Sequence, residues 1–328
     1  MRRNIMQFLR SRSGEYISGE EISRQLKVSR TAIWKHIQAL RQEGYRIESH
    51  PRLGYCLREI PDRLLPDEIG MKLTTKILGK QIHYFTDVHS TNNEAKRIAM
   101  ADAPEGTIVV AEAQNRGRGR MSRGWFSPFA KGIWFSVILR PPFSPAEAPK
   151  CTLMAAVAVS SAIQQVTGVA CGIKWPNDIL YQGKKIVGIL TEMSAEIDVI
   201  NYIVIGIGIN VNIGQEEFPA EISGLSTSLA IEAGRKISRL DLLTAILQQL
   251  ESLYTGVLAN GFASVLGEWR SHSITLGQNV EVLGGTGNFT GIAVDIDNDG
   301  ALLIQTGSGV EKVLAGDVSI RPRTVERR

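Results

Sequence analysis

The sequence lacks long hydrophobic runs, and its cysteines are few. No stretch of 18 apolar residues occurs among the 328 residues, so we expect no transmembrane helix. Residues 1–12 contain arginines but no continuous apolar core, so we expect no signal peptide. The three cysteines, Cys56, Cys151 and Cys171, are far apart and show no metal-ligand spacing. An odd number of cysteines without a signal peptide predicts reduced core thiols in a cytoplasmic protein.

Two common nucleotide-binding signatures are also absent. The segment Gly206-Ile207-Gly208-Ile209-Asn210 lacks the third glycine of the dinucleotide fingerprint, and no phosphate-binding P-loop occurs. No internal repeat of about 20–50 residues appears. Apolar residues make up 43% and charged residues 21% of the chain, which excludes a disordered protein. The length predicts two or three globular domains.

Net charge is small but unevenly distributed. The whole chain carries a formal charge of +4, whereas residues 1–62 hold 12 basic and 7 acidic residues, a net charge of +5. Residues 63–328 hold 25 basic and 26 acidic residues and are close to neutral. A small basic module beside a neutral body is a first indication of nucleic-acid binding.

The N-terminal module predicts helices followed by a hairpin. Ser18 with Glu21 forms a capping box, and Ser29 caps a longer helix that Gly44 ends. Apolar residues at helical spacing give this helix a core-facing stripe. The predicted elements are helices over residues 4–13 and 30–43, a short helix after Ser18, and strands over residues 45–48 and 55–59.

This order of elements is typical of a winged helix-turn-helix, whose second helix enters the major groove of DNA. A three-helix protein-interaction module or a degenerate winged helix would show the same pattern. Trp34 could equally belong to the core of the module. The candidate DNA-binding residues are Ser29, Arg30, Thr31, Trp34 and Lys35 on the helix and Arg52 on the wing.

After a linker bracketed by Pro61 and Pro66, strands and helices alternate, which predicts an α+β domain with a mixed sheet. We expect Thr91 to cap a helix that runs to Met100. The alternating isoleucines of residues 201–213 predict a strand with one buried face. The other predicted elements are strands over residues 81–86, 107–114, 133–139 and 186–192 and a long helix over residues 147–167.

A glycine- and arginine-rich segment, residues 114–125, lies between two of these strands. It holds four arginines and three glycines, and no acidic residue occurs between Glu112 and Glu147. Glycine lets backbone N–H groups approach a ligand, and arginine matches phosphate oxygens bidentately. The segment therefore predicts a lid over a phosphate-bearing ligand. A disordered segment that binds RNA nonspecifically is the alternative.

A second polar cluster is Lys174-Trp175-Pro176-Asn177-Asp178, followed by Lys185 at the head of a strand. A cation, a neutral amide and a carboxylate together are the components of a nucleotide–Mg²⁺ site. A surface turn could show the same residues, so the pattern by itself leaves both interpretations open.

Taken together, these clusters resemble the biotin–protein ligases. The order and spacing match over nearly the whole chain, and the N-terminal winged helix resembles the bifunctional type that also represses biotin genes. A lipoate ligase would share the fold, but the Lys174–Asp178 string disfavours it. The matching segments are Ser90-Thr91-Asn92, Gly117–Arg120 with Trp125, Lys174–Asp178 with Lys185, and Gly206–Asn210.

The resemblance implies acyl transfer in two steps. The biotin carboxylate attacks the α-phosphorus of ATP, giving biotinyl-5′-adenylate and pyrophosphate, and a lysine of biotin carboxyl carrier protein then attacks the mixed anhydride. The catalytic residues would be Lys185, Arg118 and Arg120. The biotin-binding residues would be Ser90, Thr91, Asn92, Gln114, Arg118, Gly119, Arg120, Lys185, Gly206 and Gly208. The ATP- or adenylate-binding residues would be Arg118, Arg120, Trp125, Lys174, Asn177, Lys185 and Asn210, with Asp178 near Mg²⁺.

The resemblance also implies three domains: a winged helix over residues 1–62, a ligase domain over residues 66–272, and a small SH3-like barrel over residues 273–328. Short strands predicted over residues 279–283, 290–295, 301–305 and 310–314 fit the last of these. The implied partners are the carrier protein, operator DNA and a second copy of the chain when the adenylate is bound, without a membrane. A monofunctional ligase with a vestigial DNA-binding domain and a catalytically silent biotin-sensing repressor are the alternatives.

Overall fold

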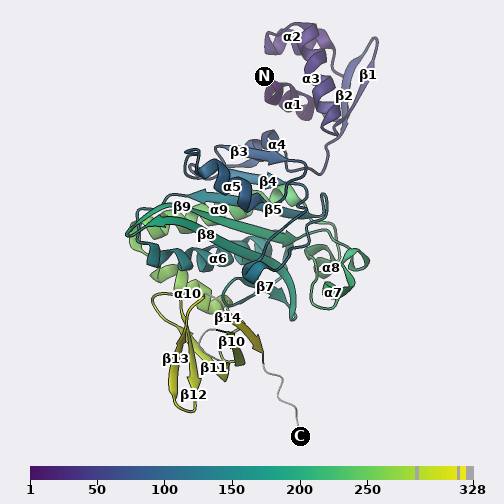
Figure 1. Ribbon diagram of the computed structural model, residues 1–328. Helices are drawn as coiled ribbons and strands as arrows, with labels where there is room; N and C mark the ends of the chain where they lie inside the picture. Colours follow the sequence, from purple (N-terminus) through teal and green to yellow (C-terminus); the bar gives the residue numbers. More distant parts are fainter. Residues whose placement is uncertain (285–287, 316–317, 323–328) are drawn as a thin grey trace. The chain divides into compact units, whose positions relative to one another are not determined.

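The computed structural model describes residues 1–284, 288–315 and 318–322. The chain forms two compact units, Met1–Arg63 and Leu64–Arg328 (Figure 1). Among the described residues, no helix combines the length and the apolar character that crossing a membrane requires. All three cysteines are buried and free, as the sequence predicts.

The first unit has the predicted order of helices and strands. Ser18 and Ser29 cap α2 and α3 by accepting hydrogen bonds from the N–H groups of Glu21 (3.1 Å) and Ala32 (3.2 Å). Gly44 follows α3 with a φ of +99°, a left-handed conformation that glycine adopts without a steric cost. The elements are α1 (Arg2–Ser11), α2 (Gly19–Leu26), α3 (Arg30–Gln42), β1 (Arg46–His50) and β2 (Gly54–Glu59).

A seven-stranded mixed sheet forms the centre of the second unit (Figure 1). Its order is β3-β4-β5-β9-β8-β7-β6, and only β3 and β4 are parallel. The two short strands next to Pro176, β6 and β7, are not predicted from the sequence. The strands are β3 (Ile82–Phe85), β4 (Ile108–Ala111), β5 (Gly132–Leu139), β6 (Gly172–Lys174), β7 (Asp178–Tyr181), β8 (Lys184–Glu196) and β9 (Val199–Asn210).

Helices cover both faces of this sheet. Residues of α6 and α9 share one large core with the odd-numbered isoleucines of β9, and α5 packs against Tyr202 and Val204 on the other face. The prediction that β9 buries a single face is therefore wrong: both faces are covered over residues 202–210. The helices of the unit are α4 (Pro66–Lys72), α5 (Thr91–Ala99), α6 (Ala148–Thr167), α7 (Ala220–Ser223), α8 (Leu229–Ala233), α9 (Arg239–Asn260) and α10 (Ala263–His272).

The start of α5 differs from the expectation. The N-cap is Ser90, without a side-chain capping hydrogen bond, and Thr91 is the first helical residue. The hydroxyl of Thr91 is engaged elsewhere, since it donates to Gln114 Oε1 (3.2 Å) and accepts from Ser136 (2.8 Å). Tertiary contacts thus replace the predicted local cap.

The C-terminal strands form one antiparallel sheet in the order β13-β12-β11-β10-β14. Among the described residues, the edge strands β13 and β14 each pair on one side only. Val280, Ala293 and Ile304 join the core of the central sheet, so these strands pack into the second unit. β14 is not predicted from the sequence. The strands are β10 (Asn279–Gly284), β11 (Phe289–Ile296), β12 (Leu302–Thr306), β13 (Gly309–Val313) and β14 (Val318–Pro322).

A fully buried ion pair lies at the end of β4. Arg239, the first residue of α9, donates to Glu112 Oε2 (2.9 Å), and neither side chain is exposed to solvent. The other carboxylate oxygen of Glu112 accepts the backbone N–H of Leu64 (2.8 Å) and the hydroxyl of Tyr84 (3.3 Å). The pair therefore fixes the chain just after β4, because Glu112 lies two residues before Gln114.

Candidate active site

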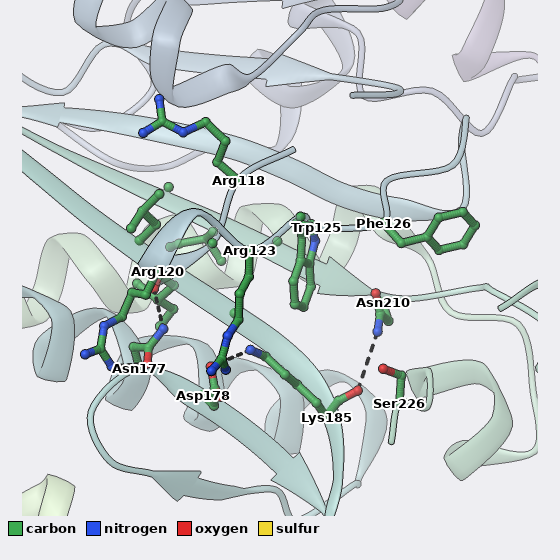
Figure 2. A pocket seen from close by; sticks show the side chains of 18 of the residues that line it. Arg118, Arg120, Arg123, Trp125, Phe126, Asn177, Asp178, Lys185, Asn210 and Ser226 are labelled. Atoms are coloured by element: carbon green, nitrogen blue, oxygen red, sulfur yellow. Dashed lines mark hydrogen bonds and ion pairs between the residues drawn. The ribbon is translucent and has the colours of Figure 1, made fainter. Parts of the chain in front are cut away.

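A cavity of about 350 Å³ lies over strands β8 and β9 and under the glycine- and arginine-rich loop, residues 114–125 (Figure 2). Every ligand-contacting residue predicted for the second unit lines it, although those residues come from five separate parts of the sequence. They are Ser90, Thr91, Asn92, Gln114, Arg118, Gly119, Arg120, Trp125, Lys174, Asn177, Asp178, Lys185, Gly206, Gly208 and Asn210.

One end of the cavity is a hydrogen-bonded polar network. Gln114 Oε1 accepts the backbone N–H of Thr91 (2.8 Å), and Gln114 Nε2 donates to Ser127 (3.0 Å). Ser136 donates to Asn92 Oδ1 (2.7 Å). These contacts fix the amide orientations, so both donors and acceptors are presented at defined places.

Glycines form the floor of the cavity because the side chains above lie very close to the strands. A Cβ atom on Gly206 would lie 1.8 Å from Asn92 Oδ1, and one on Gly208 would lie 2.2 Å from Trp125 Nε1. Gly188, directly opposite Gly208 in the β8–β9 ladder, also lies under the Trp125 ring. The sequence motifs do not include Gly188, although a glycine inside a strand is a signal for close approach.

Lys185 and Asp178 meet at the opposite end. Lys185 Nζ lies 2.6 Å from Asp178 Oδ1 and 5.1 Å from the centre of the Trp125 ring. The backbone of Lys185 is held by Leu225, whose carbonyl accepts its N–H (2.8 Å). Figure 2 shows the lysine side chain extending from the head of β8 toward Asp178. The cation is thus placed beside the single carboxylate among the described lining residues.

The loop is folded as a tight hairpin. Gly119 donates its N–H to Arg123 O (2.7 Å), and Trp125 donates to Gly117 O (2.9 Å). A Cβ atom on Gly117 would lie 2.4 Å from Trp125 O, which explains the glycine there. The tip is strained, because non-glycine residues 121 and 122 both have positive φ angles, of 53° and 56°.

Two loop arginines point to opposite ends of the cavity (Figure 2). Arg120 donates to Asn177 Oδ1 (3.1 Å) and to the carbonyl of Ala315 (3.3 Å), on the C-terminal part of the chain. Arg118 points the other way and donates to Asn93 Oδ1 (3.1 Å). Protein acceptors therefore bind both guanidinium groups and hold the loop across the cavity.

Glu192, on β8, lies behind this network. Its carboxylate contacts Lys96 Nζ (2.7 Å) and Asn92 Nδ2 (2.9 Å). Burial raises the pKa of Glu192, but the hydrogen bonds from Lys96 and Asn92 lower it. With the neighbouring positive charges, the net pKa lies below its usual value, so the carboxylate is ionised at neutral pH.

Several lining residues carry no signal in the sequence. Arg123 belongs to the glycine- and arginine-rich loop, but the sequence predicts no role for it; Figure 2 shows its side chain extending toward Asp178. Others are apolar or small residues outside the predicted segments, which only the fold brings together. Among them are Phe126, Phe218, Ile222, Leu225 and Ser226.

Metal-ligating groups are sparse. Among the described residues, no group of three or more His, Cys, Asp and Glu side chains is placed to hold a metal ion. Asp178 is the one carboxylate among the described lining residues.

In the first unit, the six candidate DNA-binding residues are all exposed. Trp34 is 53% exposed, so it does not belong to the core. Arg30 forms an exposed ion pair with Glu20 at 2.9 Å, and the Ser29 hydroxyl caps α3. The exposed residues lie on the N-terminal half of α3 and between β1 and β2, as the sequence predicts for a helix and a wing.

Comparisons with known proteins place each part of the chain. Residues 83–210 match the biotin/lipoate A/B protein ligase family, residues 2–56 match a helix-turn-helix domain, and residues 275–321 match the C-terminal domain of biotin protein ligases. The chain is similar to the bifunctional ligase/repressor BirA of Bacillus subtilis, with 42% identity over 98% of both chains. It is 30% identical to the bifunctional ligase/repressor BirA of Escherichia coli over 94% of both chains.

A solved structure gives the same result. The biotin protein ligase from Aquifex aeolicus, in complex with biotin and ATP, has a TM-score of 0.65 and 32% identity to this chain. The match spans 74% of this chain and the whole of the Aquifex aeolicus chain.

Proposed function

The chain belongs to the biotin protein ligase family, and we propose that the cavity over β8 and β9 is where it joins biotin to ATP and then to a carrier protein. The protein is a bifunctional biotin–protein ligase and transcriptional repressor, with biotin and ATP as substrates. A monofunctional ligase with a vestigial DNA-binding domain is not favoured, because 98% of the chain is similar to a bifunctional ligase/repressor. A catalytically silent biotin sensor is not favoured, because all three proposed catalytic cations are present. The observation that carries the assignment of the cavity is that Lys185, Arg118 and Arg120 all line it.

We assign the polar end of the cavity to the bicyclic ring of biotin. The amide oxygen of Asn92 and the polar side chains of Thr91, Gln114 and Ser90 line this end and would meet the ureido group. Gly206 and Gly208 let the Asn92 amide and the Trp125 indole lie directly against the sheet, beside the place that we assign to the flat ring. The floor glycines thus set how deep these two side chains lie in the biotin site.

Lys185 is placed for the first chemical step. The biotin carboxylate and the α-phosphate of ATP are both anions, so a cation must offset their repulsion and the charge that develops in the transition state. Lys185 would exchange its contact with Asp178 for these oxygen atoms. Arg120 and Arg123 would hold the phosphates from the loop side, with Lys174, Asn177 and Asn210 completing this end.

Trp125 would pack on the adenine, whose hydrophobic surroundings come from Phe126, Phe218 and Ile222. Its indole Nε1 is buried without a hydrogen-bond partner among the described residues. A buried donor without a partner is costly, so a ligand acceptor would stabilise the closed site.

The cavity fits a magnesium ion only as part of a nucleotide complex. Mg²⁺ is commonly held by one or two carboxylates together with substrate phosphates, and Asp178 is the carboxylate available. The ion would neutralise charge on the phosphates when bound. Asp178 would hold the ion, and Lys185 would remain the cation that meets the substrate oxygen atoms.

The second step needs a dry, closed site. The mixed anhydride is hydrolysable, so the loop must exclude water until the lysine of the carrier protein arrives. We propose that residues 115–125 open to admit substrates and close over the adenylate. The protein acceptors of Arg118 and Arg120 favour the closed form even before an anion binds.

Repression would follow from occupancy of the same site. If the bound adenylate favours a homodimer, two winged helices can bind two half-sites of an operator, and ligand occupancy sets DNA affinity. When acceptor protein is scarce, the adenylate remains bound and transcription of the biotin genes stops.

Intact-mass analysis tests the proposal directly. A carboxyl carrier domain is incubated with the protein, biotin, ATP and Mg²⁺, and we expect one biotin adduct that requires ATP. A folded protein that yields no adduct would overturn the proposed catalytic role of the cavity and favour a ligand-sensing repressor.

A further inference from the structure

Glu192 contacts two separate parts of the active site, helix α5 and the glycine- and arginine-rich loop. Its Oε2 atom accepts the amide of Asn92 (2.9 Å), which is fixed on α5, and its Oε1 atom lies 3.7 Å from Arg118 Nη2, which belongs to the loop. The side chain of Glu192 is 21% exposed, against 46% for Arg118. A half-buried carboxylate therefore bridges the biotin end of the cavity and the lid.

The amide of Asn92 depends on this contact. Its Nδ2 group donates to the carbonyl of Leu190 (3.1 Å) as well as to Glu192, which leaves Oδ1 to face Gly206 and accept from Ser136. Both hydrogens of the amide are thus used behind the cavity. The oxygen is held over the floor, where a ring N–H group would reach it.

Arg118 depends on it as well. The guanidinium group donates to Asn93 Oδ1 and lies against Glu192, away from the Lys185–Asp178 end (Figure 2). Lys96 and Arg118 together bring two positive charges to one carboxylate. Lys96 lies on α5, whereas Arg118 lies on the loop. Removing the carboxylate would leave these two cations to repel each other, and Arg118 would move away with the loop.

We propose that Glu192 is a positioning residue that couples closure of the 115–125 loop to the orientation of Asn92. When Arg118 reaches Glu192, the lid is fastened at the biotin end and the amide that meets the ring is fixed by the same carboxylate. This inference rests on the proposed function of the cavity. It predicts that loss of Glu192 impairs retention of biotin and adenylate more than use of ATP.

The test compares adenylate retention in single and double variants of the full-length protein. The protein is loaded with radiolabelled biotin and ATP, and release of labelled adenylate is followed after adding excess unlabelled biotin. We expect Glu192→Gln, which keeps the shape but removes the charge, to speed release about threefold to tenfold, as for coupled neighbouring residues. The KM for biotin should rise by a similar factor, and the KM for ATP should stay within about twofold.

A double-mutant cycle separates the positioning role from simple support of the fold. In an Arg118→Met background, Glu192→Gln should speed adenylate release little further, because the contact between Arg118 and Glu192 is already lost. Lys96→Met is the matched control: it removes the other cation that contacts Glu192 and should leave release close to wild type. Additive effects of Glu192→Gln and Arg118→Met, or release from Lys96→Met equal to that from Glu192→Gln, would overturn the inference.

Failure of the inference can be told from failure of the proposed function. A wild-type protein that forms no adenylate contradicts the function, whereas an Arg118→Met effect without a Glu192→Gln effect contradicts only the inference. If Glu192→Gln does not fold, Glu192→Asp is measured in its place. This variant keeps the charge but shortens the side chain, so normal adenylate release from it would also overturn the inference.

Discussion

The ammonium group of Lys185 lies 2.6 Å from the carboxylate of Asp178, so the proposed catalytic cation is paired with a protein anion in the free site. The pairing keeps a strong positive charge from standing alone in a partly closed cavity. It also holds the lysine side chain extended toward the place assigned to the phosphates. In the function that we propose, oxygen atoms of the substrates replace this carboxylate as the partner of Lys185.

Replacing this lysine should separate binding from chemistry. We expect Lys185→Ala to lower the rate of adenylate formation by about 100-fold or more, the usual cost of removing one group that stabilises developing charge. Biotin should still bind through the polar end of the cavity. Single-turnover adenylation and calorimetric biotin binding measure the two effects. A biotin affinity that falls as far as the rate would contradict the assignment.

The floor of the biotin site should not accept a methyl group. In Gly206→Ala the new Cβ would lie 1.8 Å from Asn92 Oδ1, so the amide must move. Overpacking of this kind costs about 1–3 kcal/mol, and we expect biotin binding to weaken by a similar free energy. Gly256→Ala is the control, since its Cβ meets no atom within 4 Å on an exposed face of α9. Calorimetry should show unchanged biotin affinity for the control.

The loop offers trypsin four arginines, at positions 116, 118, 120 and 123. We expect cleavage there to slow when biotinyl-adenylate is bound, because the closed lid withdraws the backbone from the protease. Limited proteolysis followed by mass spectrometry locates the cuts. Equal cleavage with and without the adenylate would sink the idea that ligand closes the lid.

Exposed cations of α3 should contribute to DNA binding and have no effect on ligase activity. We expect Arg30→Ala and Lys35→Ala to weaken binding to DNA from upstream of the biotin genes, and each lost phosphate contact to lower the salt slope by about 1. Gel-shift titrations at several salt concentrations measure this effect. Arg97→Ala, an exposed arginine of the other unit, is the control. An equal loss of ligase activity would mean that α3 supports the fold.

The buried pair of Arg239 and Glu112 should dominate stability near the linker. Removing one partner leaves a buried charge without compensation, which typically costs about 3–5 kcal/mol. We therefore expect Arg239→Met to lower the free energy of unfolding by that amount in urea titrations. The double variant Arg239→Met with Glu112→Gln should lose less. A larger loss in the double variant would contradict this explanation.

Local patterns predict most of the secondary structure because capping, helical stripes and glycine C-caps depend on near neighbours in the chain. Ser18, Ser29 and Gly44 act where the sequence places them. Thr91 shows where this reasoning fails. Its hydroxyl bonds to side chains 23 and 45 residues away, which outcompete the local cap.

The sequence by itself determined which chemistry this protein carries. The arginine-rich loop, the lysine at the head of a strand and the strand glycines occur in an order that is specific to biotin–protein ligases. Only the tertiary structure decided how they are used. The strand register sets Gly188 opposite Gly208 under Trp125, and the fold turns Arg118 toward Glu192 and Arg120 toward Ala315. Such contacts join segments far apart in the chain, and their geometry depends on packing that local spacing does not encode.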